Sequence, residues 1–327
     1  MFDPTTPIKV IARKDISDAL RDRFILIVTS FLAIAALVSL VTGAISLSVD
    51  VTAYEEARAL LVQLGRDPTT LAAPNFFPLK LLRGAIEQIE IIGAVLGILA
   101  GFRAASSERG RQTLALIMTR PLKKWQFLAG KFVAAIALLG GSLLAVFVLG
   151  LVLLAATSGV GIGFGDVGRV LLVWAMATIY AATFFVMSFT LSLWMKNTGN
   201  ALLVAFVIWL LLVLVAPQIG DTMDPDNQVA GGVFRQLQVP RDEEARIRAS
   251  YGTFEMIRTG IEAVSLTKHF ERFSFAVLGI KDSYAGNPLG PILVEKKGEI
   301  FWIIFSFLGL TILMFALPLK SNRLTKE

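Results

Sequence analysis

The chain has 327 residues, of which 55% are hydrophobic and only 17% are charged, and its mean hydropathy is +0.69. A soluble domain carries roughly 25% charged residues, so the composition excludes an ordinary soluble protein and favours a membrane protein. The net charge of +6 comes from basic residues beside apolar runs, which indicates membrane orientation and not nucleic-acid binding, and the absence of cysteine excludes disulfides and thiolate metal sites.

Residues 1–23 predict a helix that lies on the membrane surface. Apolar side chains such as Ile8, Ile11 and Ile16 recur at helical spacing, and basic side chains such as Lys9 and Arg13 fall between them. The pattern suits the membrane interface, and a helix packed on a partner protein would show it as well. The charge-free run 24–47 follows and is too long for the core of a signal peptide, so we expect a retained span.

Five further apolar runs predict spans at 79–101, 127–156, 167–195, 201–216 and 299–319. Pro217 is expected to end the fifth span, because proline removes a helix hydrogen bond. The expected fold is an all-α polytopic membrane protein with six transmembrane helices. Its parts are an interfacial helix at 1–23, spans one to five at 24–217, an external helical segment at 218–298, and the sixth span with a cytoplasmic tail at 299–327.

The orientation of the chain in the membrane follows from the lysines and arginines in its short loops, which concentrate on the cytoplasmic side. One side of the predicted topology collects most of them, whereas the other has Arg58 and Arg66 in its first loop and none at 157–166. We therefore predict a multi-pass protein of the cell membrane with both termini in the cytoplasm and 218–298 outside. The basic residues on the cytoplasmic side are Lys9, Arg13, Lys14, Arg21, Arg23, Arg103, Arg109, Arg111, Arg120, Lys123, Lys124, Lys196, Lys320, Arg323 and Lys326.

The external segment is expected to be helical. Ser265 is placed to cap a helix at 266–278. Before it, six apolar side chains step by three or four residues and predict one helix with a single apolar face. These two helices would pack on the outer membrane surface, cover the pore exit or shield the ends of the spans, and an external partner could bind them. The six apolar residues are Ile247, Tyr251, Phe254, Ile257, Ile261 and Val264.

Motifs for nucleotide and metal chemistry are missing from the sequence. A phosphate-binding loop needs Gly-Lys followed by Ser or Thr, but Phe132 follows Gly130 and Lys131. A G-x-G-x-x-G match that begins at Gly163 lies between two spans and follows no strand, so it predicts a tight turn. The single histidine, His269, provides no metal cluster and no catalytic triad. We therefore expect no cofactor on this chain and no ATP hydrolysis by the chain alone.

The connector between the second and third spans is the most informative stretch. Residues 108–118 predict a short amphipathic helix with Leu114, Ile117 and Met118 on one side, and Pro121 ends it. Such a helix would dock in a groove of a soluble partner or lie on lipid head groups.

At these residues the sequence resembles the ABC-2 family of ATP-binding-cassette transporter permeases. The matching residues are Glu108, Thr113, Leu114, Pro121, Gly130 and Lys131, and Gln112 stands where the family has glycine. Residues 11–23 look like the start of permeases of the nitrous-oxide-reductase maturation type, and residues 265–270 look like the segment before the family's last span.

The resemblance implies a six-span permease that pairs with a second copy and engages a separate ATPase subunit, which would hold ATP and Mg. The connector would be the coupling helix that contacts the ATPase, and 1–23 would be an elbow helix. The expected function is export, or mechanical work on a membrane process. The coupling residues would be Glu108, Thr113, Leu114, Ile117 and Pro121.

The second span carries charges that are expensive in lipid. Arg83, Glu87 and Glu90 would share one helical face, with Glu87 about 12 Å into the span. They would line a translocation path, form a gating ion pair or join helices structurally. If they relay protons, the chain is instead an ion-gradient-driven secondary transporter that uses Glu87 and Glu90. On the same span, a ridge of small residues predicts close helix packing: Gly93, Gly97 and Gly101.

Overall fold

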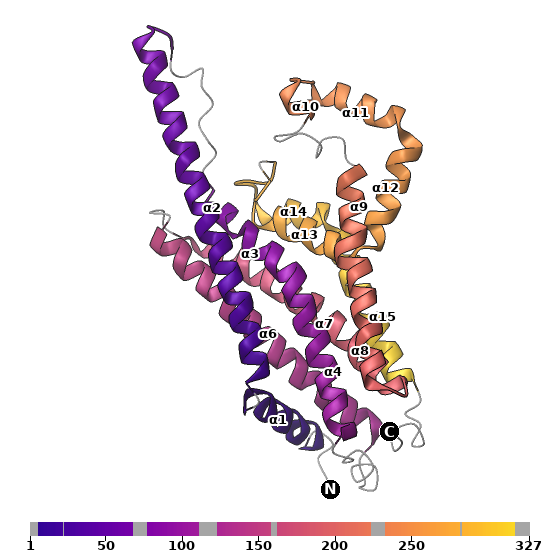
Figure 1. Cartoon of the computed structure of the whole chain (residues 1–327). Coiled ribbons are helices and arrows are strands. Elements are labelled where there is room, and N and C mark those ends of the chain that lie inside the picture. The colour runs from indigo at the N-terminus through magenta and orange to yellow at the C-terminus, as the bar shows by residue number, and fades with distance from the viewer. Residues whose placement is uncertain are drawn as a thin grey trace.

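A computed structural model describes residues 6–21, 23–67, 77–110, 123–157, 162–223, 233–281 and 283–317. Every regular element in these residues is a helix (Figure 1), and six helices among them are long and apolar enough to cross a membrane. The prediction of an all-α polytopic membrane protein is therefore confirmed. The six candidate spans are Phe24–Ile45, Pro78–Glu108, Lys124–Ala156, Phe164–Trp194, Thr198–Met223 and Lys297–Ala316.

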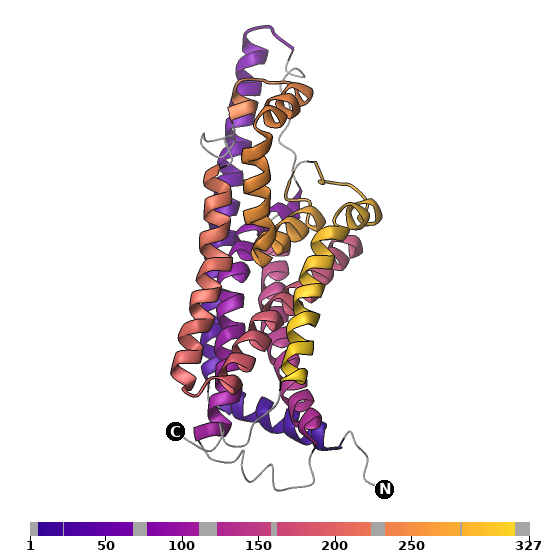
Figure 2. The ribbon, with the colours of Figure 1, turned by 90° about the vertical axis from the view of Figure 1, so that its right-hand side faces the viewer.

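Helix α1 (Thr6–Arg21) lies across one end of the helix bundle (Figures 1 and 2). It packs on α6 (Lys124–Thr157), and its Ala12 is buried. The helices approach closely at Gly130, where an added Cβ would lie 2.8 Å from the Cβ of Ile11. The helical spacing of apolar residues in α1 therefore matches a face that packs on the third span.

Helix α2 (Phe24–Gln63) has 40 residues and continues well beyond the expected span at 24–47. Figure 1 shows it extending away from the bundle. Its polar continuation holds no glycine or proline, so nothing in the chain interrupts the helix before Gly65. Gly65 has a φ of +65°, the left-handed conformation that glycine adopts readily after a helix end.

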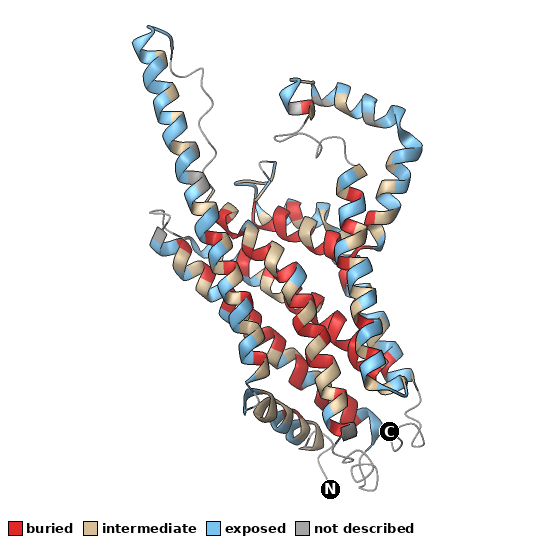
Figure 3. Cartoon of the chain, in the orientation of Figure 1, coloured by how far each residue is buried: buried red, intermediate tan, exposed pale blue. Residues whose placement is uncertain are grey.

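The second span is built from four consecutive segments: η2 (Pro78–Leu82), α3 (Arg83–Gln88), the π-helical turn η3 (Ile89–Gly93) and α4 (Ala94–Gly110). Helix α4 packs extensively on α7 (Phe164–Trp194). In the apolar window of α7, 72% of the residues are buried, against 11% in that of the sixth span. Helix α7 is therefore the centre of the bundle, as the red ribbon in Figure 3 shows.

The prediction that Pro217 ends the fifth span is wrong. The span passes from α8 (Thr198–Trp209) through a π-helical turn, η4 (Leu210–Val215), into α9 (Ala216–Met223). In the π pattern each carbonyl accepts from the N–H five residues later, so the carbonyl of Leu212 would need the N–H that proline lacks. The hydroxyl of Ser265 donates to that carbonyl over 2.7 Å, which explains how the helix continues.

The segment after the fifth span forms α10 (Val233–Gln236), α11 (Arg241–Ser250), α12 (Gly252–Val264), α13 (Leu266–Val277) and α14 (Leu289–Glu295), before the sixth span α15 (Lys297–Ala316). The single helix expected over the apolar stripe is wrong: α11 and α12 are separate, and Tyr251 lies between them before Gly252, a poor helix former. The predicted cap is confirmed, because the side chain of Ser265 accepts a hydrogen bond from the N–H of Lys268.

Helix α13 lies at the end of the bundle opposite α1 and packs on α7 and α15 (Figures 1 and 2). Ten of its residues are buried, from Leu266 to Val277 with Glu271 and Arg272 partly exposed. The two ends of the bundle are named the α1 end and the α13 end, and α2 and α10–α12 extend beyond α13 (Figure 1).

Candidate functional site

A buried ion cluster at the α1 end joins three helices. The ammonium of Lys131, whose residue is 2% exposed, lies 2.9 Å from Asp15 of α1 and 2.9 Å from Glu108 of α4. Lys14 of α1 also reaches Glu108, at 3.1 Å. Burial raises the pKa of the Asp15 carboxyl, against the lowering influence of Lys131. Breaking a buried pair leaves an uncompensated charge, so this cluster holds the ends of α4 and α6 firmly to α1.

The charges of the second span do not form one equivalent face. Arg83 and Glu87 pair at 2.9 Å, and their side chains are 64% and 45% exposed. Glu90 lies on the π-helical turn η3 and is only 8% exposed. Its Oε1 has no hydrogen-bond partner among the described residues, and it interacts electrostatically with Glu271 and Lys268 of α13. A π-helical turn has more residues per turn than an α-helix, so the side chains that follow are rotated about the helix axis. This rotation separates Glu90 from the exposed Arg83–Glu87 pair.

Close backbone contact joins α4 to α7. An added Cβ at Gly97 would lie 2.2 Å from the carbonyl oxygen of Ala181, and one at Gly101 would lie 2.4 Å from that of Phe185. At Gly93 the nearest atom would be a side-chain carbon of Ile89, 3.3 Å away within the same span. Gly97 and Gly101 thus lie at the α4–α7 contact, whereas a Cβ at Gly93 would meet only side-chain carbons, of Ile89 and, at 4.0 Å, of Leu143 in α6.

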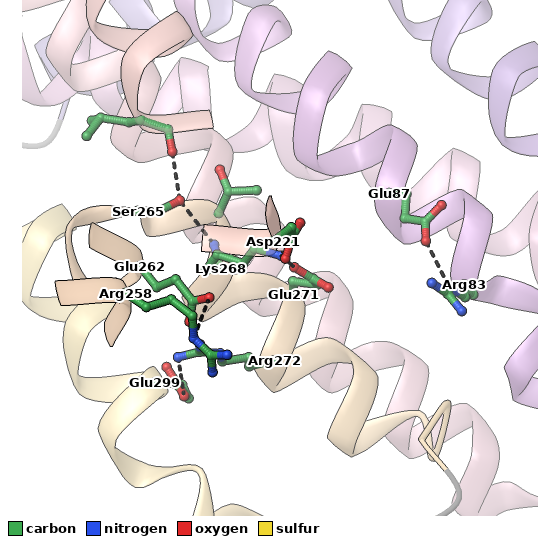
Figure 4. A network of polar contacts seen from close by, with 12 residues as sticks. Arg83, Glu87, Asp221, Arg258, Glu262, Ser265, Lys268, Glu271, Arg272 and Glu299 are labelled. Atoms are coloured by element: carbon green, nitrogen blue, oxygen red, sulfur yellow. Dashed lines mark hydrogen bonds and ion pairs between the residues drawn. The ribbon is translucent and has the colours of Figure 1, made fainter. Parts of the chain in front are cut away.

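Polar contacts connect α13 to the neighbouring helices (Figure 4). Lys268 pairs with Asp221 of α9 at 2.8 Å and with Glu271 at 2.9 Å. Burial lowers the pKa of Lys268, but the charge of Glu271 and the hydrogen bonds that Lys268 donates to Asp221 and Glu271 outweigh this effect and raise the pKa. This lysine therefore stays charged and ties α13 to the fifth span.

Two further residues of α13 bind α12 and α15. Arg272 pairs with Glu262 of α12 and lies 4.0 Å from Glu299 of α15. His269 pairs with Glu299 and contacts the carbonyl of Ala263 at 3.0 Å. In Figure 4, Arg272 points to Glu262 and Glu299, and the Arg83–Glu87 pair lies apart from this network. Glu299 lies 30 residues after His269, and Glu262 lies on a different helix from Arg272, so no pattern within one helix predicts these contacts.

A cavity of about 760 Å³ opens beside this network. Its lining combines cations and carboxylates from the second span, α9, α12 and α13, including Arg83, Asp221, Arg258 and Glu271. Among the described residues, no group of three or more histidine, aspartate or glutamate side chains is placed to hold a metal ion. The arrangement suits a polar ligand, or a change in which ion pairs exchange partners.

A model of the ABC-2 family transporter proteins matches residues 9–321. This chain belongs to the ABC-2 family. The family makes it the membrane subunit of an ABC transporter, which implies an ABC ATPase as partner. A comparison with curated proteins found no match.

In this ABC-2 permease, the sequence-predicted coupling residues fall in two classes. Glu108, expected to begin a connector helix, lies instead in the last turn of α4 and is 4% exposed. Its carboxylate contacts α1 and α6 of the same chain. Sequence analysis found Lys131 as a motif match but missed its role as an ion partner. The remaining residues lie outside the described part of the chain: Thr113, Leu114, Ile117 and Pro121.

Proposed function

We propose that this permease couples ATP hydrolysis by a separate ATPase to export, or to mechanical work, across the cell membrane. The ATPase, which holds ATP and Mg, docks at the α1 end, and that end faces the cytoplasm. The basic residues of the α1 end, such as Arg21, Arg103 and Lys196, support this orientation by the positive-inside rule.

The observation that carries the proposal is the Lys131 cluster. The connector 111–122 follows the end of α4 at Gly110, two residues after Glu108, and α6 begins at Lys124, seven residues before Lys131. Both flanks of the connector therefore meet in one ion cluster that also holds α1. A force applied to the connector, through Thr113, Leu114, Ile117 and Pro121, is transmitted to all three helices together.

Two copies of the permease form the transport unit. The apolar windows of the first, fifth and sixth spans are only 22%, 17% and 11% buried within one chain. These surfaces need lipid or protein as neighbours, because water cannot solvate them favourably. A second copy covers part of them, and lipid covers the rest.

The test uses the complex of permease and ATPase in proteoliposomes, with the isosteric change Lys131→Met. Because the chain has no cysteine, spin labels at the exposed positions Thr259 and Lys297 report movement at the α13 end. We expect ATP to change the label distance in the wild type and not in Lys131→Met, with assembly preserved. Lys196→Met, an exposed lysine, is the control. A Lys131→Met complex with an unchanged ATP response would refute the proposal.

Glu90 favours a second candidate, the ion-gradient-driven transporter. A buried carboxylate in a span, next to Glu271 and Lys268, has the chemistry of a proton relay. Proteoliposomes that contain the permease alone distinguish the two candidates. Proton flux that needs no ATP and disappears in Glu90→Gln would establish the second candidate, and absence of flux would dismiss it.

A further inference from the structure

A second cavity, of about 420 Å³, lies at the α1 end under the elbow helix. Helices α1, α2, α4, α6 and α7 all contribute to its lining. Its volume falls within the range of about 300–1,000 Å³ that is typical of small-molecule sites. It is separate from the 760 Å³ cavity, which lies at the α13 end.

The lining of this cavity changes from polar to apolar along the axes of α4 and α6, from the α1 end toward the middle of the spans. On α6, Lys131 comes first, and Ala134, Ala135 and Leu138 follow toward the middle of the span. Seven residues of helix cover about 10 Å, so the change occurs over the depth of a head-group region and the first part of the hydrocarbon. On α4, which runs in the opposite direction, Ser107 likewise lies nearer the α1 end than Ala100.

Small side chains create the apolar part of the cavity. Ala100 and Ala104 of α4 face Ala134 and Ala135 of α6 in the lining, and Phe185 of α7 also contributes. Methyl groups fill little of the space between three helices, so a volume remains that larger side chains would occupy. An apolar cavity of this kind gains free energy when a hydrocarbon chain enters it.

The polar part of the cavity offers two guanidinium groups. Arg21 and Arg103 both belong to the lining, and the guanidinium of Arg103 lies 4.5 Å from the ring centroid of Phe24. Guanidinium groups match the geometry of phosphate oxygens. The lining also holds Asp18, which opposes an anion, and Asp15, which is paired with Lys131. Arg21, Arg103 and Lys131 thus stand against Asp15 and Asp18 in the lining, and the remaining positive charge favours an anionic ligand.

We propose that this cavity binds an anionic phospholipid of the leaflet at the α1 end. The phosphate lies between Arg21 and Arg103, and the first part of one acyl chain lies along Ala104 and Ala135. The bound lipid fills the space between the elbow helix and the bundle, beside the Lys131 cluster. The binding site does not depend on the proposed ATPase coupling, since it lies entirely within the permease.

The test measures lipid retention on the purified permease without any ATPase. The permease is transferred from nanodiscs that contain equal amounts of phosphatidylglycerol and phosphatidylcholine into detergent, and native mass spectrometry counts the bound lipids. We expect retained phosphatidylglycerol in the wild type and about tenfold less in Arg103→Gln, because a hydrogen bond to a charged group is lost. Arg246→Gln, an exposed change on α11, should retain lipid as the wild type does.

Ala104→Leu fills the cavity from its apolar side and provides an independent variant. It should also lower phosphatidylglycerol retention, while addition of inorganic phosphate should not displace the lipid, because phosphate lacks the acyl chain. Equal retention of both lipids by the wild type would overturn the proposal. Unchanged phosphatidylglycerol retention in both Arg103→Gln and Ala104→Leu would overturn it too, and displacement by inorganic phosphate alone would show that the acyl chain plays no part.

Discussion

Ser265 connects two helices with one hydroxyl group, and its replacement by alanine should destabilise the permease strongly. The hydroxyl donates to the carbonyl of Leu212 over 2.7 Å and accepts from the N–H of Lys268 over 3.4 Å. The residue itself is 0% exposed. Loss of an N-cap costs about 1 kcal/mol, and a buried carbonyl left without a donor costs about 1–3 kcal/mol. We expect a total loss of about 2–4 kcal/mol from the free energy of unfolding.

The assay is unfolding of the permease by SDS in mixed micelles, followed by tryptophan fluorescence. Ser250→Ala is the matched control, since the Ser250 hydroxyl bonds the carbonyl of Ile247 at an exposed position. It should change the free energy by less than about 0.5 kcal/mol. Pro217→Ala supplies a sharper comparison, because residue 217 would then offer its own N–H to the Leu212 carbonyl. In that background Ser265→Ala should cost clearly less. A single-variant loss below about 0.5 kcal/mol, or an equal loss in both backgrounds, would refute the reasoning.

Three further predictions follow from the packing and the charges. Lys131→Met should lower the free energy of unfolding by about 3–5 kcal/mol, because it breaks a buried ion cluster. Arg83→Ala breaks an exposed pair and should lower it by less than about 1 kcal/mol. Unfolding by SDS compares the two variants. Gly97→Ala should cost about 3 kcal/mol, the upper end for an overpacked site, because its Cβ would meet a backbone carbonyl. Gly93→Ala should cost less than about 1 kcal/mol, and thermal unfolding in detergent compares the two variants. Because the pKa of Lys268 is raised in the folded state, its ion pairs stabilise fully below the ordinary pKa of 10.5 and lose their effect as pH rises through the higher folded value. Thermal unfolding of Lys268→Met between about pH 9 and pH 12 should lack the alkaline loss of stability that the wild type shows. The same pH profile in the variant and the wild type would contradict the assignment.

The spans could be predicted from the sequence because lipid imposes a length and an apolar composition on each of them. Their ends could not, because local packing decides them. Pro217 indicates the end of a helix, but the hydroxyl of the distant Ser265 donates to the Leu212 carbonyl and so allows the helix to continue. The extension of α2 differs from the prediction for a related reason: polar residues after an apolar span indicate a loop, although nothing in these residues opposes a helix.

The charged residues show the same division between local and distant information. The Arg83–Glu87 pair is four residues apart on one helix, and the sequence revealed it. Lys131 pairs with Asp15, 116 residues away, and Lys268 pairs with Asp221, 47 residues away, so these two pairings depend on the tertiary structure. Glu90 was expected on the face of Arg83, and the π-helical turn moved it into the protein, a change that no apolar period predicts.

The two ends of the bundle differ in how easily their ion pairs can exchange partners. At the α1 end, the side chains of Lys131 and Glu108 are 1% and 5% exposed, and a buried pair costs about 3–5 kcal/mol to break. At the α13 end, each pair joins one partly exposed side chain, Asp221 (44%) or Arg272 (34%), to a buried one, Lys268 (11%) or Glu262 (6%). Water can replace only one partner of such a pair, so breaking it costs less than breaking the Lys131–Glu108 pair but more than breaking an exposed pair. A force on the connector should therefore move α1, α4 and α6 as one body. We therefore expect the rearrangement that opens or closes the proposed path at α13, where exchange of partners costs less than at the α1 end.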